Sequence, residues 1–339
     1  LYAKHHSQRF QDQFSVADIG RLYRLPNEAV TSLGFQRLLP SNLIKQYDTL
    51  GELVTMIREP LIEVSTCMAA VRNSFPALRL VLWGSFGTGK SVTLNQAVHL
   101  AYAKNMVIVH LYSAMNLTRR VKEVEMSTFK QGRINDPVNA VEVLQRFKEQ
   151  NQHVWKTLSG LKIESTGNRH PPFLATDCVG ALFRELKRHS SADSIKLFVA
   201  VDDANSLWGK TLVKKADRSY VSAWSQYRVV HMKCYNGCIL LVADKKEVAD
   251  ARDELTVPRH TPLELFGEEG FHFIEPFVPV EVKLYSKEEV ANMYQYYHDK
   301  RWLASEKGKL RLRPETSTFL NAYNNNRATT FNIFDRITR

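Results

Sequence analysis

One segment, residues 84–91, constrains the fold of this chain more than any other part of its sequence. It reads Gly84-Ser85-Phe86-Gly87-Thr88-Gly89-Lys90-Ser91 and matches the phosphate-binding pattern G-x-x-x-x-G-K-[ST], the Walker A motif. The apolar residues 78–83 precede it and predict a buried strand, and apolar residues at helical spacing follow it between 94 and 102. A strand, a glycine loop and a helix in this order indicate a P-loop within a parallel α/β sheet.

The residue types in this loop suit the binding of a nucleoside diphosphate or triphosphate. Glycines allow the backbone to turn its N–H groups toward phosphate oxygens, and the following helix points its positive end at the same place. Lys90 brings an ammonium group to the β- and γ-phosphates, and the Ser91 hydroxyl is placed to bind Mg²⁺. We therefore predict that every position of the loop binds the cofactor: Gly84, Ser85, Phe86, Gly87, Thr88, Gly89, Lys90 and Ser91.

A second motif lies at the end of another apolar stretch, residues 195–201, which leads directly into Asp202. A carboxylate at the end of a buried strand beside a P-loop can hold Mg²⁺ through water, which is the Walker B role. We therefore predict that Asp202 contacts the cofactor and that Ser91 and Asp202 together bind Mg²⁺.

Two further acidic residues bear on hydrolysis. P-loop ATPases with an added strand between the two motifs usually carry Glu at the position of Asp203, where it polarises the attacking water. Asp is one methylene shorter, so Asp203 is only a candidate catalytic residue, and we expect hydrolysis to be slow or absent. Asp244 ends the apolar stretch 238–243, where such ATPases sense the γ-phosphate with a polar residue. A carboxylate there repels phosphate unless a metal or Lys245 intervenes.

Local residues leave the base open. No Asn-Lys-x-Asp motif, which reads guanine, occurs in the sequence, so the motifs do not choose between guanine and adenine. His231, Cys234 and Cys238 have a spacing that could suggest zinc, but a clear second pair of ligands is lacking and Cys238 begins an apolar stretch. Buried free cysteine is the simpler interpretation.

Charge and composition narrow the class of protein. The 46 Lys and Arg against 35 Asp and Glu give a net charge of +11, which favours a polyanionic partner such as RNA or an acidic protein surface. Basic clusters lie at residues 119–122, 210–218 and 307–313, although each also suits a solvated surface.

Four cysteines are too few for a disulfide scaffold, which indicates a reducing compartment. No apolar run approaches the ~18 residues of a membrane helix. The first residue is Leu1 rather than Met, which is consistent with a removed leader.

The pattern of apolar and helix-breaking residues divides the chain. We expect three parts: an N-terminal arm with helices (1–59), a P-loop nucleotide-binding domain with a long polar insertion at about 113–175 (60–282), and a small C-terminal helical domain (283–339). Helical signals occur at 16–23 and 44–57 in the first part. Ser286 and Glu289 fit a capping box at the start of the third.

Four stretches resemble the death-associated-protein family of mitochondrial ribosomal small-subunit GTP-binding proteins. They are residues 82–91, residues 199–202 with 205–211, residues 265–271 with 275–280, and residues 296–297 with 301–303. Together they extend over about residues 60 to 305. Many families share the Walker motifs. The Trp208-Gly209 segment and the Phe277-Val278-Pro279 segment are much more particular to this family.

The resemblance implies an AAA-like P-loop fold, an α/β parallel sheet flanked by helices, in the head of the mitochondrial small ribosomal subunit. It also implies bound GTP or GDP with Mg²⁺, although ATP stays an open alternative. The implied partners are ribosomal RNA, neighbouring small-subunit proteins and the large subunit across a bridge, with no membrane span and no homo-oligomer. The family is also linked to apoptosis. Relatives commonly carry Gly after the Walker B Asp, so Asp203 departs from them.

These expectations define two hypotheses. The leading one is a structural ribosomal protein in the mitochondrial matrix that supports translation and is at most a weak GTPase, since the usual catalytic Glu is absent. The alternative is a free-standing AAA-like or signalling ATPase, which needs a competent water-activating acid and normally an arginine finger from a neighbouring subunit. A small-molecule kinase is disfavoured because no Arg-rich lid motif is visible.

Overall fold

The computed structural model describes residues 14–39, 41–72, 75–119, 124–126, 134–159, 175–208, 210–214, 220–222, 235–244 and 261–301. Several predictions fall on other residues. The basic cluster at 307–313, most of the predicted C-terminal domain, His231, Cys234 and Lys245 all lie outside the described part of the chain.

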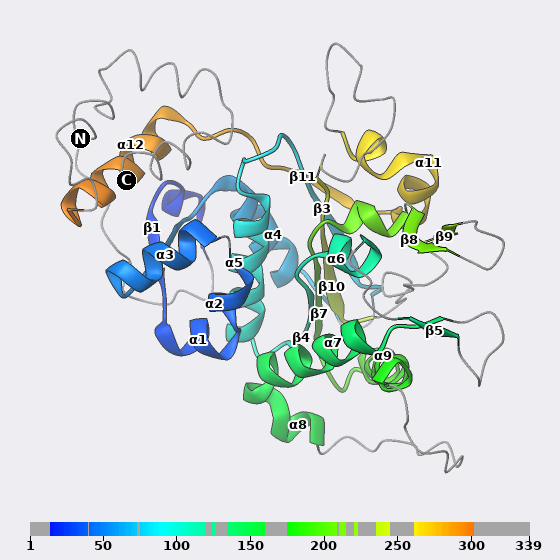
Figure 1. Ribbon diagram of the computed structural model, residues 1–339. Coiled ribbons are helices and arrows are strands. Elements are labelled where there is room, and N and C mark those ends of the chain that lie inside the picture. The colour runs from blue at the N-terminus through cyan, green and yellow to red at the C-terminus, as the bar shows by residue number, and fades with distance from the viewer. Residues whose placement is uncertain are drawn as a thin grey trace.

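A parallel sheet of five strands occupies the centre of the molecule (Figure 1). The strands are β3 (Leu78–Trp83), β4 (Val107–Leu111), β7 (Leu197–Val201), β10 (Gly237–Val242) and β11 (Val278–Glu281). Their spatial order is β11-β3-β10-β7-β4, and every neighbouring pair is parallel. β3, β7 and β10 match the apolar stretches 78–83, 195–201 and 238–243 of the sequence.

The strand order confirms the predicted fold class. β3 leads into the glycine loop and β7 leads into Asp202, and β10 lies between them as the added strand. In the register of the sheet, Leu82 lies opposite Val242, and Leu241 lies opposite Val201. Because parallel strands that end together present their following loops at one edge, this register brings the two motifs and Asp244 to the same edge.

Alternating side chains of the strands build a core on each face of the sheet. On one face Leu80 and Leu82 pack with α4 (Glu59–Ala69) and α5 (Lys90–Ala103). On the other face Val81 packs in a cluster with residues of α6 (Ala114–Arg119), α9 (Ala175–Ser191), the short 3₁₀ helix η3 (Ala204–Trp208) and α11 (Pro262–Ile274). Both faces of the sheet are therefore covered, as expected for parallel strands that are apolar throughout.

The second face is built from the segments between the strands. The remaining elements there are α7 (Pro137–Gln150), η2 (Gln152–Val154), α8 (Trp155–Ser159), α9 (Ala175–Ser191), η3 (Ala204–Trp208) and α11 (Pro262–Ile274). Two short antiparallel pairs accompany them, β5 (Glu125–Met126) with β6 (Ile134–Asn135) and β8 (Lys210–Lys214) with β9 (Tyr220–Ser222). Asp136 caps α7 by accepting from the backbone N–H of Asn139, and Pro137 occupies the first helical position.

The N-terminal segment differs from its prediction. It contains η1 (Val16–Asp18), β1 (Leu22–Leu25), α1 (Asn27–Ser32), α2 (Phe35–Leu38), α3 (Ser41–Leu50) and β2 (Leu53–Met56). The helical interpretations of 16–23 and 44–57 are wrong at β1 and β2, which pair antiparallel. The two strands lie about thirty residues apart in sequence, and local periodicity carries no information about such a long-range pairing.

Helix α12 (Lys287–Asp299) joins this N-terminal segment. Ser286 and Glu289 form the predicted capping box. Val290, Tyr294 and Tyr297 of α12 share a hydrophobic cluster with Leu22 and Met56 of the β1–β2 pair. Figure 1 shows the orange α12 beside the blue β1, so residues from both ends of the described chain form one lobe next to α5.

The strand β11 was not predicted from the sequence because Pro279 interrupts it. Proline is tolerated there since β11 is an edge strand of the sheet.

Among the helices in the described residues, none combines the length and the apolar character needed to cross a bilayer.

Two buried histidines predict acid sensitivity. Burial lowers the pKa of His99 to about 4 and that of His110 to about 3, from an ordinary 6.5. The unfolded chain therefore binds protons between pH 6.5 and 4 that the folded chain does not, so stability is full above pH 6.5 and is lost as the pH falls. We expect the free energy of unfolding to fall by about 3 kcal/mol over this range from His99 alone.

Denaturant titration of wild type and His99→Gln between pH 7 and pH 4.5 measures this contribution. The Tyr23 hydroxyl contacts Nδ1 of His99, and the Gln amide can keep a hydrogen bond there. The wild type should lose stability more steeply than the variant, by up to about 1.4 kcal/mol per pH unit. Parallel curves for the two proteins would show that His99 is not a buried neutral group.

Candidate functional site

The glycine loop joins β3 to α5 in the backbone conformation that the motif demands. Gly84, Gly87 and Gly89 have φ values of 134°, 81° and 95°, a region that side chains with a Cβ avoid. A Cβ on Gly84 would lie 2.7 Å from the carbonyl oxygen of Val282, because the segment after β11 passes directly over the loop. Gly89 is the N-cap of α5, so the positive end of that helix faces the loop.

The Lys90 side chain is turned into the loop. Its Nζ donates hydrogen bonds to the carbonyl oxygens of Gly84 at 3.0 Å and Ser85 at 2.7 Å. It also lies 3.6 Å from Oδ2 of Asp244, and the residue is 3% exposed. The ammonium group therefore lies where the motif requires it, at the centre of the loop.

Asp202 lies within hydrogen-bonding reach of Ser91, the other residue of the predicted Mg²⁺ site. The Ser91 hydroxyl hydrogen-bonds the Asp202 carboxylate, which favours the charged form. Burial is the largest effect and, with the negative charges of Asp203 and Asp244, it raises the pKa of Asp202 well above its usual range. A divalent cation at this carboxylate would relieve both the burial cost and the repulsion.

Asp203 is held by neighbouring groups. Its Oδ2 accepts a hydrogen bond from the Ser113 hydroxyl at 2.8 Å, and its backbone N–H donates to Oδ1 of Asp202. Its φ of 53° lies in the left-handed region, which is sparsely populated by residues other than glycine. The side chain is thus tied to the end of β4, and the structure adds nothing that supports a catalytic role.

Asp244 is placed by Asn205. The Asn205 side chain donates to the carbonyl oxygen of Asp244 at 2.8 Å and accepts from its backbone N–H at 3.2 Å. The carboxylate faces Lys90, and its Oδ1 is buried and has no hydrogen-bond partner among the described residues. The sequence suggested that Lys245 could intervene between Asp244 and phosphate. Lys245 lies outside the described residues, and among the described residues Lys90 faces this carboxylate.

Arg58 contacts the loop from a direction that the motifs do not reveal. Its guanidinium donates to the carbonyl oxygens of Thr88 at 2.8 Å, Lys283 at 2.8 Å and Leu284 at 3.1 Å. It also pairs with Glu289 of α12 at 3.0 Å and lies 4.0 Å from the centre of the Tyr285 ring. A single buried side chain thus joins the P-loop to the lobe that contains α12.

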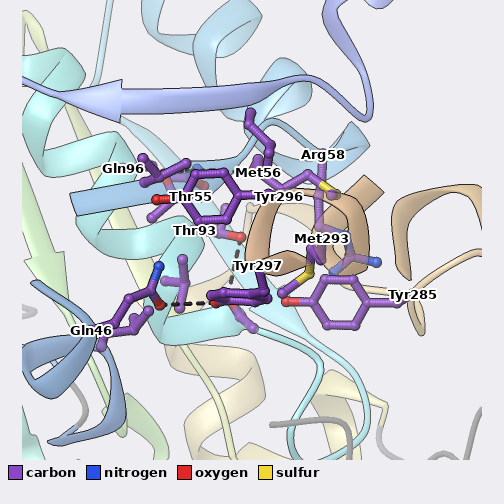
Figure 2. Close-up of a pocket in the computed structure, with 15 residues that line it drawn as sticks. Gln46, Thr55, Met56, Arg58, Thr93, Gln96, Tyr285, Met293, Tyr296 and Tyr297 are labelled. Atoms are coloured by element: carbon purple, nitrogen blue, oxygen red, sulfur yellow. Dashed lines mark hydrogen bonds between the residues drawn. The ribbon is translucent and has the colours of Figure 1, made fainter. Parts of the chain in front are cut away.

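A cavity of about 40 Å³ opens next to Gly89, between α5, β2 and α12 (Figure 2). Its polar lining includes Gln46, Thr55 and Gln96, and its aromatic lining includes Tyr285 and Tyr297. Figure 2 shows the amide of Gln46 pointing toward Tyr297, whose hydroxyl donates to Oε1 at 2.9 Å. Nε2 of Gln46 is buried and unpaired among the described residues.

The structure brings most of the predicted site together. The eight loop residues, Asp202, Asp203 and Asp244 meet at the carboxyl edge of β3, β7 and β10. α6, which ends at Arg119, packs against β8, which begins at Lys210, and the rest of these two predicted basic clusters lies outside the described residues. Cys238 is fully buried within β10. In the described part of the chain, no group of three or more His, Cys, Asp or Glu side chains is arranged to hold a metal.

The fold and this edge of the sheet define a P-loop NTPase-like protein of the class with an added strand between the Walker motifs. The family model of mitochondrial ribosomal death-associated protein 3 matches residues 55–166 and 165–324. The chain therefore belongs to this family, which confirms the resemblance seen in the sequence and the location on the mitochondrial ribosome.

Two relatives are small ribosomal subunit proteins named mS29. The protein from Bos taurus is 30% identical over 317 residues, which cover 85% of this chain and 77% of the relative. The protein from Mus musculus is 30% identical over 315 residues, with 85% and 78% covered. A solved structure of the ORC2 protein of Aeropyrum pernix aligns with 72% of this chain and 52% of its own, at 13% identity and a TM-score of 0.34, which is too distant a likeness to carry an argument.

Proposed function

We propose that this chain, as a component of the mitochondrial small ribosomal subunit, holds a guanine nucleotide with Mg²⁺ as a structural ligand. The observation that carries the proposal is the position of Lys90, buried inside the loop at 3.0 Å from the Gly84 carbonyl and 3.6 Å from Asp244. An ammonium group held at the positive end of α5 forms a site for a polyanion, and the loop N–H groups add to it.

Ser91 and Asp202 would hold Mg²⁺. Hydroxyl and carboxylate oxygens are the hard ligands that this ion prefers, and Mg²⁺ usually takes one or two protein ligands and completes its shell with water and phosphate oxygens. The hydrogen bond by which Ser91 lowers the pKa of Asp202 supports this pairing of ligands. When bound, the ion would neutralise phosphate charge.

The cavity beside Gly89 would receive the sugar or base. It adjoins the first turn of α5, where a nucleotide with its phosphates in the loop would continue outward. Tyr285 and Tyr297 offer aromatic faces, and the unpaired Nε2 of Gln46 can donate to a ring nitrogen or a carbonyl oxygen. The choice of guanine rests on the family resemblance, since guanine offers its O6 and N7 acceptors to such a donor.

The partners follow from family membership and charge. We propose contacts with ribosomal RNA and with neighbouring small-subunit proteins, and a bridge to the large subunit, in support of mitochondrial translation. The net charge of +11 and the packing of α6 against β8, which each contribute part of a basic cluster, support an RNA contact. The link to apoptosis stays an implication of the family, and we assign no residue to it.

Competition binding and sedimentation test this proposal. The purified chain should bind GDP or GTP in an Mg²⁺-dependent manner and prefer them to ADP and ATP by at least about tenfold. In mitochondrial lysate it should sediment with small ribosomal subunits, with guanine nucleotide in the same fraction. Binding without base preference would remove the guanine assignment, and sedimentation as a free protein would contradict the structural role.

The alternative, a free-standing ATPase that cycles, predicts sustained turnover. The Asp203 carboxylate accepts a hydrogen bond from the Ser113 hydroxyl, which argues against an acid that is free to activate water. Turnover well above a basal rate that is lost in Asp203→Ala would favour the alternative. We expect a basal rate, equal in wild type and variant.

A further inference from the structure

Asp244 is a feature of the described site that a triphosphate-binding protein would not be expected to have. Its carboxylate stands at the end of β10, directly beside β3, and its Oδ2 lies 3.6 Å from Nζ of Lys90. The residue is 9% exposed, and Oδ1 has no hydrogen-bond partner among the described residues. A buried, partly unsatisfied carboxylate thus faces the cation that serves the β- and γ-phosphates in P-loop proteins.

The charges around Lys90 strengthen this point. Asp202 experiences the negative charges of both Asp203 and Asp244, so this edge of the sheet already carries an excess of negative charge. Asp203 is hydrogen-bonded by Ser113, and Ser91 hydrogen-bonds Asp202. The ion pair that the structure shows for Asp244 is with Lys90. The two side chains are therefore partners, and a third group that binds Lys90 must approach the Asp244 carboxylate.

We propose that Asp244 selects the number of phosphates and makes this a site for a nucleoside diphosphate rather than a triphosphate. A β-phosphate bound by the loop N–H groups can share Lys90 with Asp244. A γ-phosphate must also reach Lys90, and it then brings its added negative charge to within about 5 Å of the carboxylate, which at an effective dielectric constant near 20 opposes binding by on the order of 100-fold. Mg²⁺ offsets part of this repulsion.

The inference rests on the proposed nucleotide site and adds a preference that the Walker motifs alone do not contain. It also gives a second physical reason why the bound nucleotide would not pass through cycles of triphosphate binding and hydrolysis. A site that rejects the triphosphate holds the product state, whatever the reach of Asp203. The bound nucleotide then stabilises the folded chain by mass action, since it binds the native state and not the unfolded one.

The test compares the dissociation constants of GDP and of the β,γ-imido analogue of GTP in the presence of excess Mg²⁺. The wild type should bind GDP at least about tenfold more tightly than the analogue. In Asp244→Asn the ratio should fall below about threefold, through tighter binding of the analogue. The Asn205 contacts involve backbone atoms of residue 244 and are kept in this variant.

Asp48→Asn is the matched control, because Asp48 is exposed on α3 and the variant loses the same charge away from the loop. Its ratio should equal that of wild type. If Asp244→Asn does not fold, Asp244→Ser and the wild-type ratio still decide the matter. Equal wild-type affinities, or a ratio unchanged in both Asp244 variants, would overturn the selection by Asp244 while leaving the nucleotide site intact. If neither GDP nor the analogue binds, the nucleotide site itself is overturned.

Discussion

Replacing Lys90 by alanine should weaken nucleotide binding by about 100-fold or more, which corresponds to about 3 kcal/mol. The ammonium group is buried in the loop and is held by the carbonyl oxygens of Gly84 and Ser85. Its removal takes away the positive charge that meets phosphate, and it leaves Asp244 as a buried carboxylate without its ion-pair partner. The remaining charge in the loop is then repulsive to phosphate.

Titration of wild type and Lys90→Ala with a fluorescent GDP derivative measures this loss. Lys104→Ala is the control, since Lys104 stands at the opposite end of α5 and the change of charge and volume is the same. The control should bind as wild type does. A thermal shift on addition of GDP and Mg²⁺ should occur in wild type and control and be absent in Lys90→Ala. Unchanged affinity in Lys90→Ala would exclude the loop as the phosphate site.

Gly84→Ala should destabilise the whole domain by about 3 kcal/mol or more. The new Cβ would lie 2.7 Å from the carbonyl oxygen of Val282, and the φ of 134° is strained for any residue with a Cβ. Val282 cannot move away freely, because its N–H donates to the carbonyl oxygen of Trp83 at 2.8 Å. The clash therefore forces either the P-loop or the backbone at Val282, beside the edge strand, to move.

Thermal unfolding without nucleotide measures this effect, and we expect a fall in Tm of about 6–12 °C. Gly51→Ala is the matched control. Gly51 also has a positive φ, 66°, but a Cβ there meets nothing within 4 Å, so it should cost only about 1 kcal/mol. Equal losses in the two variants would mean that backbone strain alone matters and that the close approach of Val282 is unimportant.

The parts of the site that follow one another in sequence were predictable. The loop, its flanking strand and helix, and the strand before Asp202 are continuous segments whose apolar runs and glycines carry their own structural signal. The same holds for local caps, such as Asp136 at α7 and the Ser286–Glu289 box at α12. In each case the residues that specify the structure lie within a few positions of the structure they specify.

The parts that depend on contacts between distant segments were not predictable from periodicity. Arg58 has no motif, yet it bonds Thr88 and Glu289, which lie 30 and 231 residues away. β1 and β2 read as helical because each is four residues long and finds its partner across the intervening helices. The Lys90–Asp244 pair needed the strand order, because only the insertion of β10 next to β3 brings Asp244 to the loop.

The central claim, that this loop holds a nucleotide in the native protein, is tested most directly by the nucleotide content of the purified chain. Protein isolated without added nucleotide is denatured, and the released bases are separated and quantified against the protein concentration. We predict close to one guanine nucleotide per chain, mainly as diphosphate, and close to none from Lys90→Ala. Folded wild-type protein that releases no nucleotide, and acquires none when incubated with GDP and Mg²⁺, would contradict the account.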